Sequence, residues 1–211
     1  MSKVVKSLAA GALLGFSAFS SAAVLTAADY ASIEVSEPSG WTVVDSEIDK
    51  LVDGDLSTSG NGRFAGRIGS ADPLTSSNPF LITLNLDELF DVSKITLFTE
   101  WGTQRTQSVS ELTLVALDTF GDELFNAELA GLSGSVGSFD PIDLFEGSLF
   151  GVSTLNFYVT GSNNDSSIEI REIQVEGEAS SNAQPPVAVN APASVGIFGL
   201  LTLALLRLRR K

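Results

Sequence analysis

The side chains of this sequence that are most able to do chemistry, by their number and type, are carboxylates. The 211 residues contain 26 Asp and Glu against 12 Lys and Arg, with no His and no Cys. Carboxylate oxygens bind hard cations such as Ca²⁺. Without His and Cys, the chain cannot form a Ser-His-Asp triad, a Cys-His catalytic pair or a zinc site with His ligands.

The sequence VDGD, from Val52 to Asp55, places a glycine between two aspartates. Glycine permits a turn sharp enough to point several oxygens inward. The alternative is a plain turn, because Asp-Gly is common turn chemistry. An EF-hand is excluded, since its sixth and twelfth positions fall on Thr58 and Phe64 rather than on Gly and Glu. The sequence therefore allows two interpretations, a cation-binding loop and a plain turn.

Catalysis by a pair of carboxylates is the remaining enzymatic hypothesis. Glycosidases hold two carboxyl groups about 5–9 Å apart, but nothing in the sequence singles out such a pair. All 26 acidic residues lie between Asp29 and Glu178, a range that holds six basic residues. An acidic surface of this kind repels phosphate backbones. We therefore expect a protein that is not an enzyme and does not bind nucleic acid.

Strands must position these side chains, because the middle of the chain alternates with the period of β-structure. Phe80, Ile82, Leu84 and Leu86 fall on one face of the segment 79–86, with polar residues on the other. Short helical segments are expected only near Asp49 and Asp140. The sequence predicts an all-β sandwich. Its clearest strands cover residues 79–86, 92–99, 109–117, 153–161 and 167–177.

The last of these strands changes its hydrophobic phase. Ile168 and Ile170 alternate in one phase, and Ile173 and Val175 follow the other. All four reach the core if an extra residue lies near Arg171–Glu172, which predicts a β-bulge that redirects the glutamate. The alternative is that the last two apolar residues face the opposite side of the strand.

Three segments, in order, resemble the discoidin domain, the coagulation factor 5/8 C-terminal type. They are IDKLVDGDLSTSG (48–60), FLITLNLDELFDVSKITLF (80–98) and IEIREIQV (168–175). The match covers about residues 45–177 of a predicted β-sandwich domain at 24–177. The resemblance implies a jelly-roll sandwich of the galactose-binding-like type.

The resemblance also implies one structural calcium ion, held between the early loop and the last strand. Asp53, Asp55 and Thr58 would be the loop ligands, with a backbone carbonyl from Lys50 or Leu51. Glu172 would complete the site. Calcium accepts six to eight oxygens and mixes carboxylates, hydroxyls and carbonyls, so this ligand set suits it. Such a site would join the two ends of a domain that has no disulfide.

The same resemblance implies that loops at one end of the sandwich bind sugars or lipid headgroups. The aromatic residue common after the threonine of the first motif is absent here, which leaves other aromatic and basic residues as candidates. Trp101 would stack on a sugar face while Arg105 reaches hydroxyls; the alternative is a Trp at the core edge and an Arg paired with an acid. The further candidates are Trp41, Arg63 and Arg67.

The N-terminus has the pattern of a secretory signal peptide. Lys3 and Lys6 precede an apolar stretch, Leu8–Phe19, that leads into small residues. This order predicts a signal peptide over residues 1–22, cleaved after Ala22 or Ala23. The alternative is a transmembrane helix, which needs roughly 18 apolar residues.

The C-terminus has three parts. Residues 178–190 are rich in Ala, Ser, Asn and Pro, and predict a flexible linker. An apolar helix is expected at 193–207, and its uncharged stretch 195–206 would span about 18 Å, against about 30 Å of hydrocarbon core. The arginines after it would stay on the cytoplasmic side of the inner membrane. They are Arg207, Arg209 and Arg210.

This arrangement over 191–211 resembles the PEP-CTERM sorting signal, in an Ala-Pro variant. The resemblance implies a sorting protease or transpeptidase of the exosortase type, with a cut within a short motif. A plain tail anchor is the alternative. The motif residues are Ala191, Pro192, Ala193 and Ser194.

Together these features predict a protein exported by the secretion machinery. We expect an inner-membrane intermediate, followed by delivery to the cell surface, the outer envelope or the extracellular matrix. The expected function is glycan or exopolysaccharide binding, or a role in matrix or adhesion, without catalysis. The alternatives are a purely structural envelope or biofilm-matrix protein with no small ligand, and a carboxylate-based glycan-active enzyme.

Overall fold

The computed structural model describes residues 22–44, 48–56, 64–68, 73–99, 108–132, 141–163 and 167–181. All of these residues except Ser181 belong to a compact unit, Met1–Ser180, and a second unit comprises Ser181–Lys211. Residues 1–21 of the predicted signal peptide and residues 182–211, with most of the linker and the sorting tail, lie outside the described residues. Within the described ranges, no helix has the length and apolar character needed to cross a membrane.

Strands dominate the described part of the chain, which contains nine of them and two short 3-10 helices. The strands are β1 (Ala23–Val24), β2 (Tyr30–Ser36), β3 (Trp41–Val44), β4 (Phe64–Ile68), β5 (Phe80–Thr99), β6 (Val109–Leu117), β7 (Glu123–Ala130), β8 (Ile142–Ser162) and β9 (Ser167–Ala179). The helices are η1 (Ala27–Asp29) and η2 (Ile48–Leu51).

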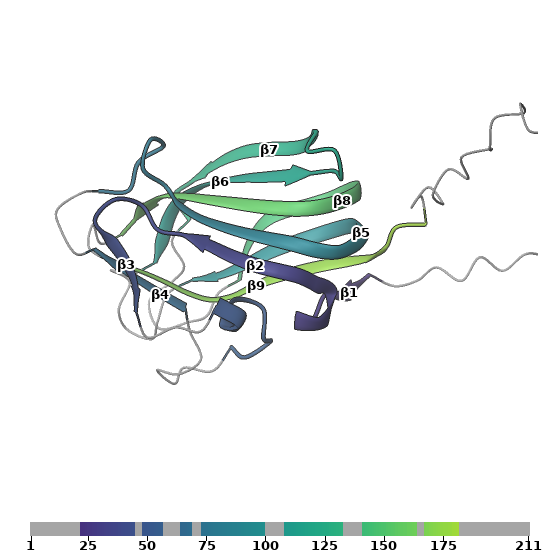
Figure 1. Ribbon diagram of the computed structural model, residues 1–211, viewed down its shortest axis with the longest axis horizontal. Helices are drawn as coiled ribbons and strands as arrows, with labels where there is room; N and C mark the ends of the chain where they lie inside the picture. The colour runs from purple at the N-terminus through teal and green to yellow at the C-terminus, as the bar shows by residue number, and fades with distance from the viewer. Residues whose placement is uncertain are drawn as a thin grey trace, which may run out of the picture. The chain divides into compact units, whose positions relative to one another are not determined.

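Two long strands, β5 and β8, contribute to both layers of the sandwich (Figure 1). The front sheet has the order β2, β5 (80–86), β8 (152–159), β6 and β7. The back sheet has the order β8 (142–149), β5 (90–99), β9, β4 and β3, and β1 pairs with the far end of β9. Every one of these pairings is antiparallel, so the described strands form a jelly-roll sandwich.

The point where β5 and β8 pass from one sheet to the other is fixed by local chemistry. Gly151 has a φ of 70°, a left-handed conformation that glycine adopts without strain. Its N–H donates a 3.0 Å hydrogen bond to Oδ1 of Asp91 on β5. The register of β5 against β8 shifts between Asn85 and Phe90. Both strands therefore bend at the same level.

The core lies between the two sheets and follows the predicted alternation. Phe80, Ile82 and Leu84 of β5 are fully buried, and Leu155 and Phe157 of β8 are buried beside them. Because successive side chains of a strand point to opposite faces, the intervening polar residues lie on the outer face. The predicted all-β sandwich is confirmed.

The structure corrects two details of the predicted elements. The segment after Asp140, expected as a short helix, is the first part of β8, where Ile142 pairs with Leu97 and Leu144 is buried. The two strands predicted at 79–86 and 92–99 are one continuous strand, β5. Pairing of residues 142–149 with β5 outweighs the local helical signal there. The short helix near Asp49 is present as η2.

The β-bulge predicted in the last strand is confirmed. Phe98 pairs with Glu172, and the next residue, Thr99, pairs with Ile170, so β9 carries one extra residue, Arg171. The apolar residues on both sides of this bulge are 0–1% exposed. The bulge therefore keeps both apolar phases in the core, and it changes the direction of the side chains next to it.

Candidate functional site

The outer face of the front sheet is polar and partly buried along its centre. On β8 it presents Thr154, Asn156, Tyr158 and Thr160, which alternate with the buried residues of that strand. Tyr158 pairs with Thr113 of β6 on one side and with a leucine of β5 on the other. An aromatic ring therefore lies among hydroxyl and amide side chains on an open sheet surface.

Hydrogen bonds between neighbouring strands order this face. Thr83 Oγ1 donates to Asn156 Oδ1 at 2.8 Å, and Thr154 Oγ1 donates to Asn85 Oδ1 at 3.2 Å. The amide of Asn85 in turn donates to Ser32 Oγ of β2 at 2.9 Å. These contacts fix the side chains before any ligand binds, so a ligand would not have to order them.

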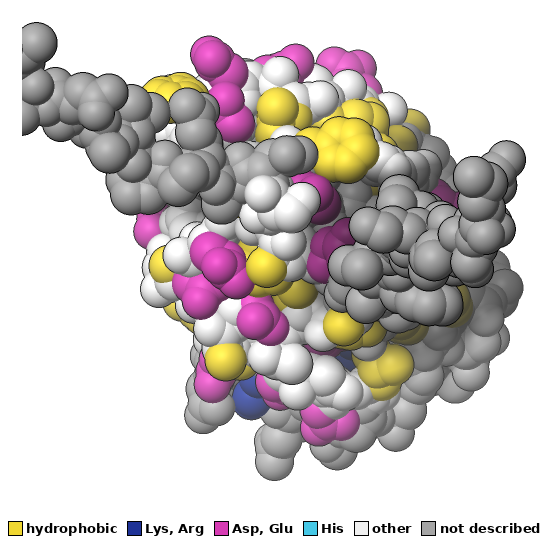
Figure 2. All heavy atoms as spheres, turned by 90° about the vertical axis from the view of Figure 1, so that its right-hand side faces the viewer, with side chains coloured by type: hydrophobic (Ala, Val, Ile, Leu, Met, Phe, Trp, Pro, Cys, Tyr) yellow, Lys and Arg dark blue, Asp and Glu magenta, His cyan; other side chains and the backbone are white. Residues whose placement is uncertain are grey.

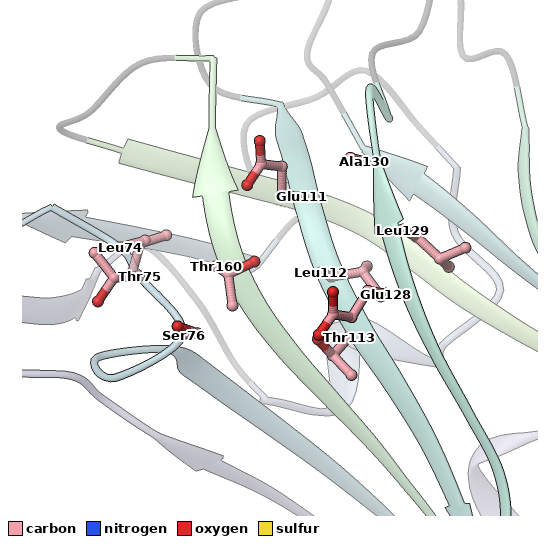
Figure 3. A pocket seen from close by; sticks show the side chains of 10 residues that line it. All are labelled: Leu74, Thr75, Ser76, Glu111, Leu112, Thr113, Glu128, Leu129, Ala130 and Thr160. Carbon is pink, nitrogen blue, oxygen red and sulfur yellow. The ribbon is translucent and has the colours of Figure 1, made fainter.

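A cleft of about 560 Å³ opens at one end of this face (Figure 3). In the close-up, Thr75 and Ser76 of the loop before β5 lie on one side, Glu128 of β7 lies on the other, and Thr160 of β8 stands between them. Hydroxyl and carboxylate groups provide its polar lining. The lining residues are Leu74, Thr75, Ser76, Glu111, Leu112, Thr113, Glu128, Leu129, Ala130 and Thr160.

The cleft adjoins the aromatic residue of the same face. Thr113 lines the cleft and is the direct strand neighbour of Tyr158. Thr160, also in the lining, lies two residues further along β8 and so on the same face. The cleft and the polar centre of the front sheet therefore form one surface, which we call the front face. It consists of the cleft lining and Thr83, Asn85, Thr154, Asn156 and Tyr158.

The opposite end of the sandwich exposes large apolar side chains among acidic ones (Figure 2). Phe120, in the turn between β6 and β7, is 88% exposed, and Phe150 of β8 is 64% exposed. Asp118 Oδ1 accepts the backbone N–H groups of Phe120 and Asp122, which fixes the turn. The sequence analysis did not select these phenylalanines, because the residue type alone does not show whether an apolar side chain is exposed.

A second candidate site forms where the loop after η2 meets the bulge of β9. The N–H of Gly54 donates to Oε1 of Glu172 at 3.1 Å, and the N–H of Asp55 donates to Oδ1 of Asp53 at 2.8 Å. Glu172 is 2% exposed, and its Oε2 atom has no hydrogen-bond partner. Burial, together with the charges of Asp53 and Asp55, raises the pKa of Glu172 to about 8, although backbone N–H groups of the loop act in the opposite direction.

Tyr30 of β2, which the sequence analysis missed, lies near Glu172. It is 8% exposed, and its hydroxyl has no hydrogen-bond partner. Burial raises the pKa of Tyr30 far above its usual value, and the charge of Glu172 raises it further. A buried tyrosine and a buried glutamate therefore lie near each other, each with an oxygen atom that lacks a protein partner. No local sequence pattern connects these two residues.

The structure brings together some of the predicted cation ligands. Asp53 lies beside Glu172, and Asp55 lies two residues further along the loop. Lys50 lies in η2, a helix that contacts β9. Thr58 lies outside the described residues. Among the residues that are described, no group of three or more Asp or Glu side chains is arranged to hold a metal ion. A cation here would need carbonyl or hydroxyl oxygens as well.

Most of the predicted sugar-binding residues fall outside the part of the chain that the structure describes. Arg63, Trp101 and Arg105 lie outside the described residues, so their roles stay predictions. The backbone of Arg67 lies in β4, opposite Ser167 of β9, but its side chain is not among the described ones. Trp41 is 4% exposed and packs edge-to-face on Phe80 with the ring centres 6.1 Å apart. It belongs to the core and is not a sugar platform.

Comparison with known proteins shows the class of fold. No protein-family model matches the sequence, and no curated protein sequence matches it. The family 32 carbohydrate-binding module of C. perfringens NanJ, solved in complex with galactose, has a TM-score of 0.52 at 13% identity, covering 74% of this chain and 98% of that one. CBM32-3 of a family 31 glycoside hydrolase from Clostridium perfringens has a TM-score of 0.51 at 18% identity, covering 74% and 95%.

These similarities establish the fold. The described body of the chain is a jelly-roll β-sandwich with the same fold as these two modules. At such low identity the similarity does not carry residue roles across, so the sites rest on the geometry given above.

The buried carboxyl group of Glu172 predicts a pH dependence of stability in cation-free protein. Its pKa rises from 4.5 to about 8 on folding, so the folded state binds a proton more tightly. The stabilisation is complete below pH 4.5 and is lost as the pH rises through about 8. Across this range the free energy of unfolding should fall by about 5 kcal/mol at most. We expect Glu172→Gln to remove this fall, measured by urea unfolding in chelator.

The matched control is Glu178→Gln, which removes an exposed carboxylate from the same strand. It should keep the pH dependence of the unmodified chain. Parallel pH profiles for the Glu172→Gln variant and the unmodified chain would contradict the prediction.

Proposed function

We propose that the chain is an exported, non-enzymatic β-sandwich that binds glycans. The observation that supports this most directly is the front face, where a cleft lined by hydroxyl and carboxylate groups adjoins an exposed sheet surface with a tyrosine at its centre. The fold is that of carbohydrate-binding modules, one of which was solved with galactose. From these modules we infer only the general class of ligand, a carbohydrate, and not a particular sugar.

The chemistry of the front face suits a polyhydroxylated ligand. Sugar hydroxyls both donate and accept hydrogen bonds, and the cleft offers carboxylate acceptors together with hydroxyls that do both. Tyr158 adds a flat apolar ring with a polar tip. Polar groups placed around an apolar surface are the usual composition of a small-molecule site. The loop residues Trp101 and Arg105 remain a second proposed location for sugar binding.

Glycan binding is tested by screening the full-length chain against an array of oligosaccharides and immobilised polysaccharides. We expect at least one neutral or amine-bearing glycan to bind, and Tyr158→Ala to weaken that binding about ten-fold, since a stacked aromatic contributes roughly 1–1.5 kcal/mol. Trp101→Ala is the companion variant, because a loss confined to this variant would place binding on the loops.

Two outcomes would favour the alternatives. No binding to any glycan, combined with self-association in solution, would favour the purely structural envelope or matrix protein. Cleavage of a bound oligosaccharide would favour a carboxylate-based glycan-active enzyme.

We also propose a structural calcium ion at Glu172. The buried Oε2 atom without a partner and the raised pKa of this carboxyl group both support a cation beside it, because a cation would satisfy the oxygen and stabilise the charged form. Asp53 and Asp55 would supply further carboxylates, and Lys50 and Thr58 would supply a carbonyl and a hydroxyl. This donor set contains only oxygens, as calcium prefers.

Removal of calcium should lower the melting temperature of the purified protein. We expect a chelator to lower it by several degrees and Asp53→Ala to abolish the sensitivity, because the loop would then lose a charged ligand. Asp87→Ala, at an exposed position of β5, should retain the sensitivity. Identical melting curves with calcium and with chelator would contradict the site.

Export and sorting complete the proposal. The predicted leader would direct the body through the secretion machinery, and the tail at 191–211 would hold it briefly in the inner membrane. A sorting enzyme of the exosortase type would then release it to the cell surface or matrix. The support for this step is the order of linker, short apolar stretch and terminal arginines in the sequence.

Intact-mass analysis of protein recovered from the cell surface tests the sorting step. We expect the mature chain to begin at residue 23 or 24 and to end between Ala191 and Ser194. A mature form that retains Lys211 would contradict processing, and a form with an intact leader in the cytosol would contradict export.

A further inference from the structure

We propose that the front face binds a polysaccharide that carries protonated amino groups, of the polyglucosamine type. This inference rests on the proposed glycan binding and adds the chemical class of the glycan and the place where it binds. It comes from the cleft, from the charges of the elements around it, and from the ordered polar surface beside it.

The first step is the charge of the segments that form the front face. The strands β2, β6, β7 and β8, residues 80–90 of β5 and the loop 73–79 contain no Lys or Arg in these described segments. They carry the exposed carboxylates of Glu34, Glu111 and Glu128 on the outer side. An anionic polysaccharide would meet only like charge there, whereas a cationic one would meet opposite charge.

The second step is the placement of two of these carboxylates in the cleft. Glu128 of β7 pairs directly with Thr113 of β6, and Glu111 precedes Thr113 by two residues on the same face. The two glutamates are therefore diagonal neighbours across adjacent strands, roughly 7–8 Å apart in the backbone. Both line the cleft that the hydroxyls of Thr75, Ser76 and Thr160 also line (Figure 3).

The third step is the combination of charge with hydroxyls and an aromatic ring. A basic peptide would also meet opposite charge, but it offers few hydroxyls to a surface rich in threonine, serine and asparagine. An amino sugar polymer offers an ammonium group and hydroxyls on every unit, together with ring faces that suit Tyr158. The hydrogen bonds of Thr83 with Asn156 and of Thr154 with Asn85 hold the sheet surface in place for such a chain.

The test compares two oligomers of equal length, one of glucosamine with free amines and one fully N-acetylated, by calorimetry with the full-length chain at mildly acidic pH. We expect the free-amine oligomer to bind more tightly and its binding to weaken as salt rises. Glu111→Gln and Glu128→Gln should each weaken it about two- to five-fold, as for exposed charge pairs. Glu178→Gln, an equal charge change at an exposed position of β9, should have no effect.

Several outcomes would overturn the inference. Equal affinity for both oligomers, unchanged by either cleft variant, would leave glycan binding intact and refute the amine-specific site. Free-amine binding that Trp101→Ala abolishes and Tyr158→Ala leaves unchanged would place the ligand on the loops instead. Tighter binding of an oligolysine peptide than of the glucosamine oligomer would assign the face to a basic peptide. The absence of binding to any glycan would refute the proposed function itself.

Discussion

The antiparallel pairing of β5 with β8 is the constraint on which both candidate sites depend. Each strand runs through both sheets, so its two halves set the strand order of the front and of the back sheet at once. The bend at Gly151, held by Asp91, fixes where the exchange takes place. One consequence is that Thr154 to Thr160 of β8 stand at the centre of the front face. Another is that the second half of β5 forms the template along which β9 pairs and bulges.

The bulge in β9 joins this sandwich to the loop that would otherwise stand free beside it. Leu51 and Val52 are buried at 0% and 3% exposure, and the helix η2 contacts β9, β4 and β2. Since the chain has no cysteine, this loop is held by packing and by the hydrogen bond from Gly54 to Glu172. A buried carboxylate is costly without compensation, which is why burial raises the pKa of Glu172.

Local patterns in the sequence predicted the strands with strict alternation and the bulge, because the phase change at Arg171 is visible in the order of apolar residues. They failed at the start of β8, where Asp140-Pro141 resembles a helix start while pairing with β5 decides the outcome. They also could not separate Trp41, a core residue, from a surface aromatic. The front face depends on which strands are neighbours, and the position of loop 73–79 at the cleft that β6, β7 and β8 also line is set by the tertiary fold alone.

The separation of the two sites follows from the same topology. Glu172 belongs to the back sheet and is covered by the loop after η2, whereas the cleft lies on the outer side of the front sheet. Tyr30, on the edge strand of the front sheet, is buried and lies near enough for the charge of Glu172 to raise its pKa, so the two residues meet on the core side and not on the outer surface. A cation at Glu172 would therefore stabilise the pairing of the sheets without changing the charge of the front face. The carboxylate that would hold a cation internally, Glu172, is therefore distinct from the carboxylates that would select a cationic glycan at the surface, Glu111 and Glu128.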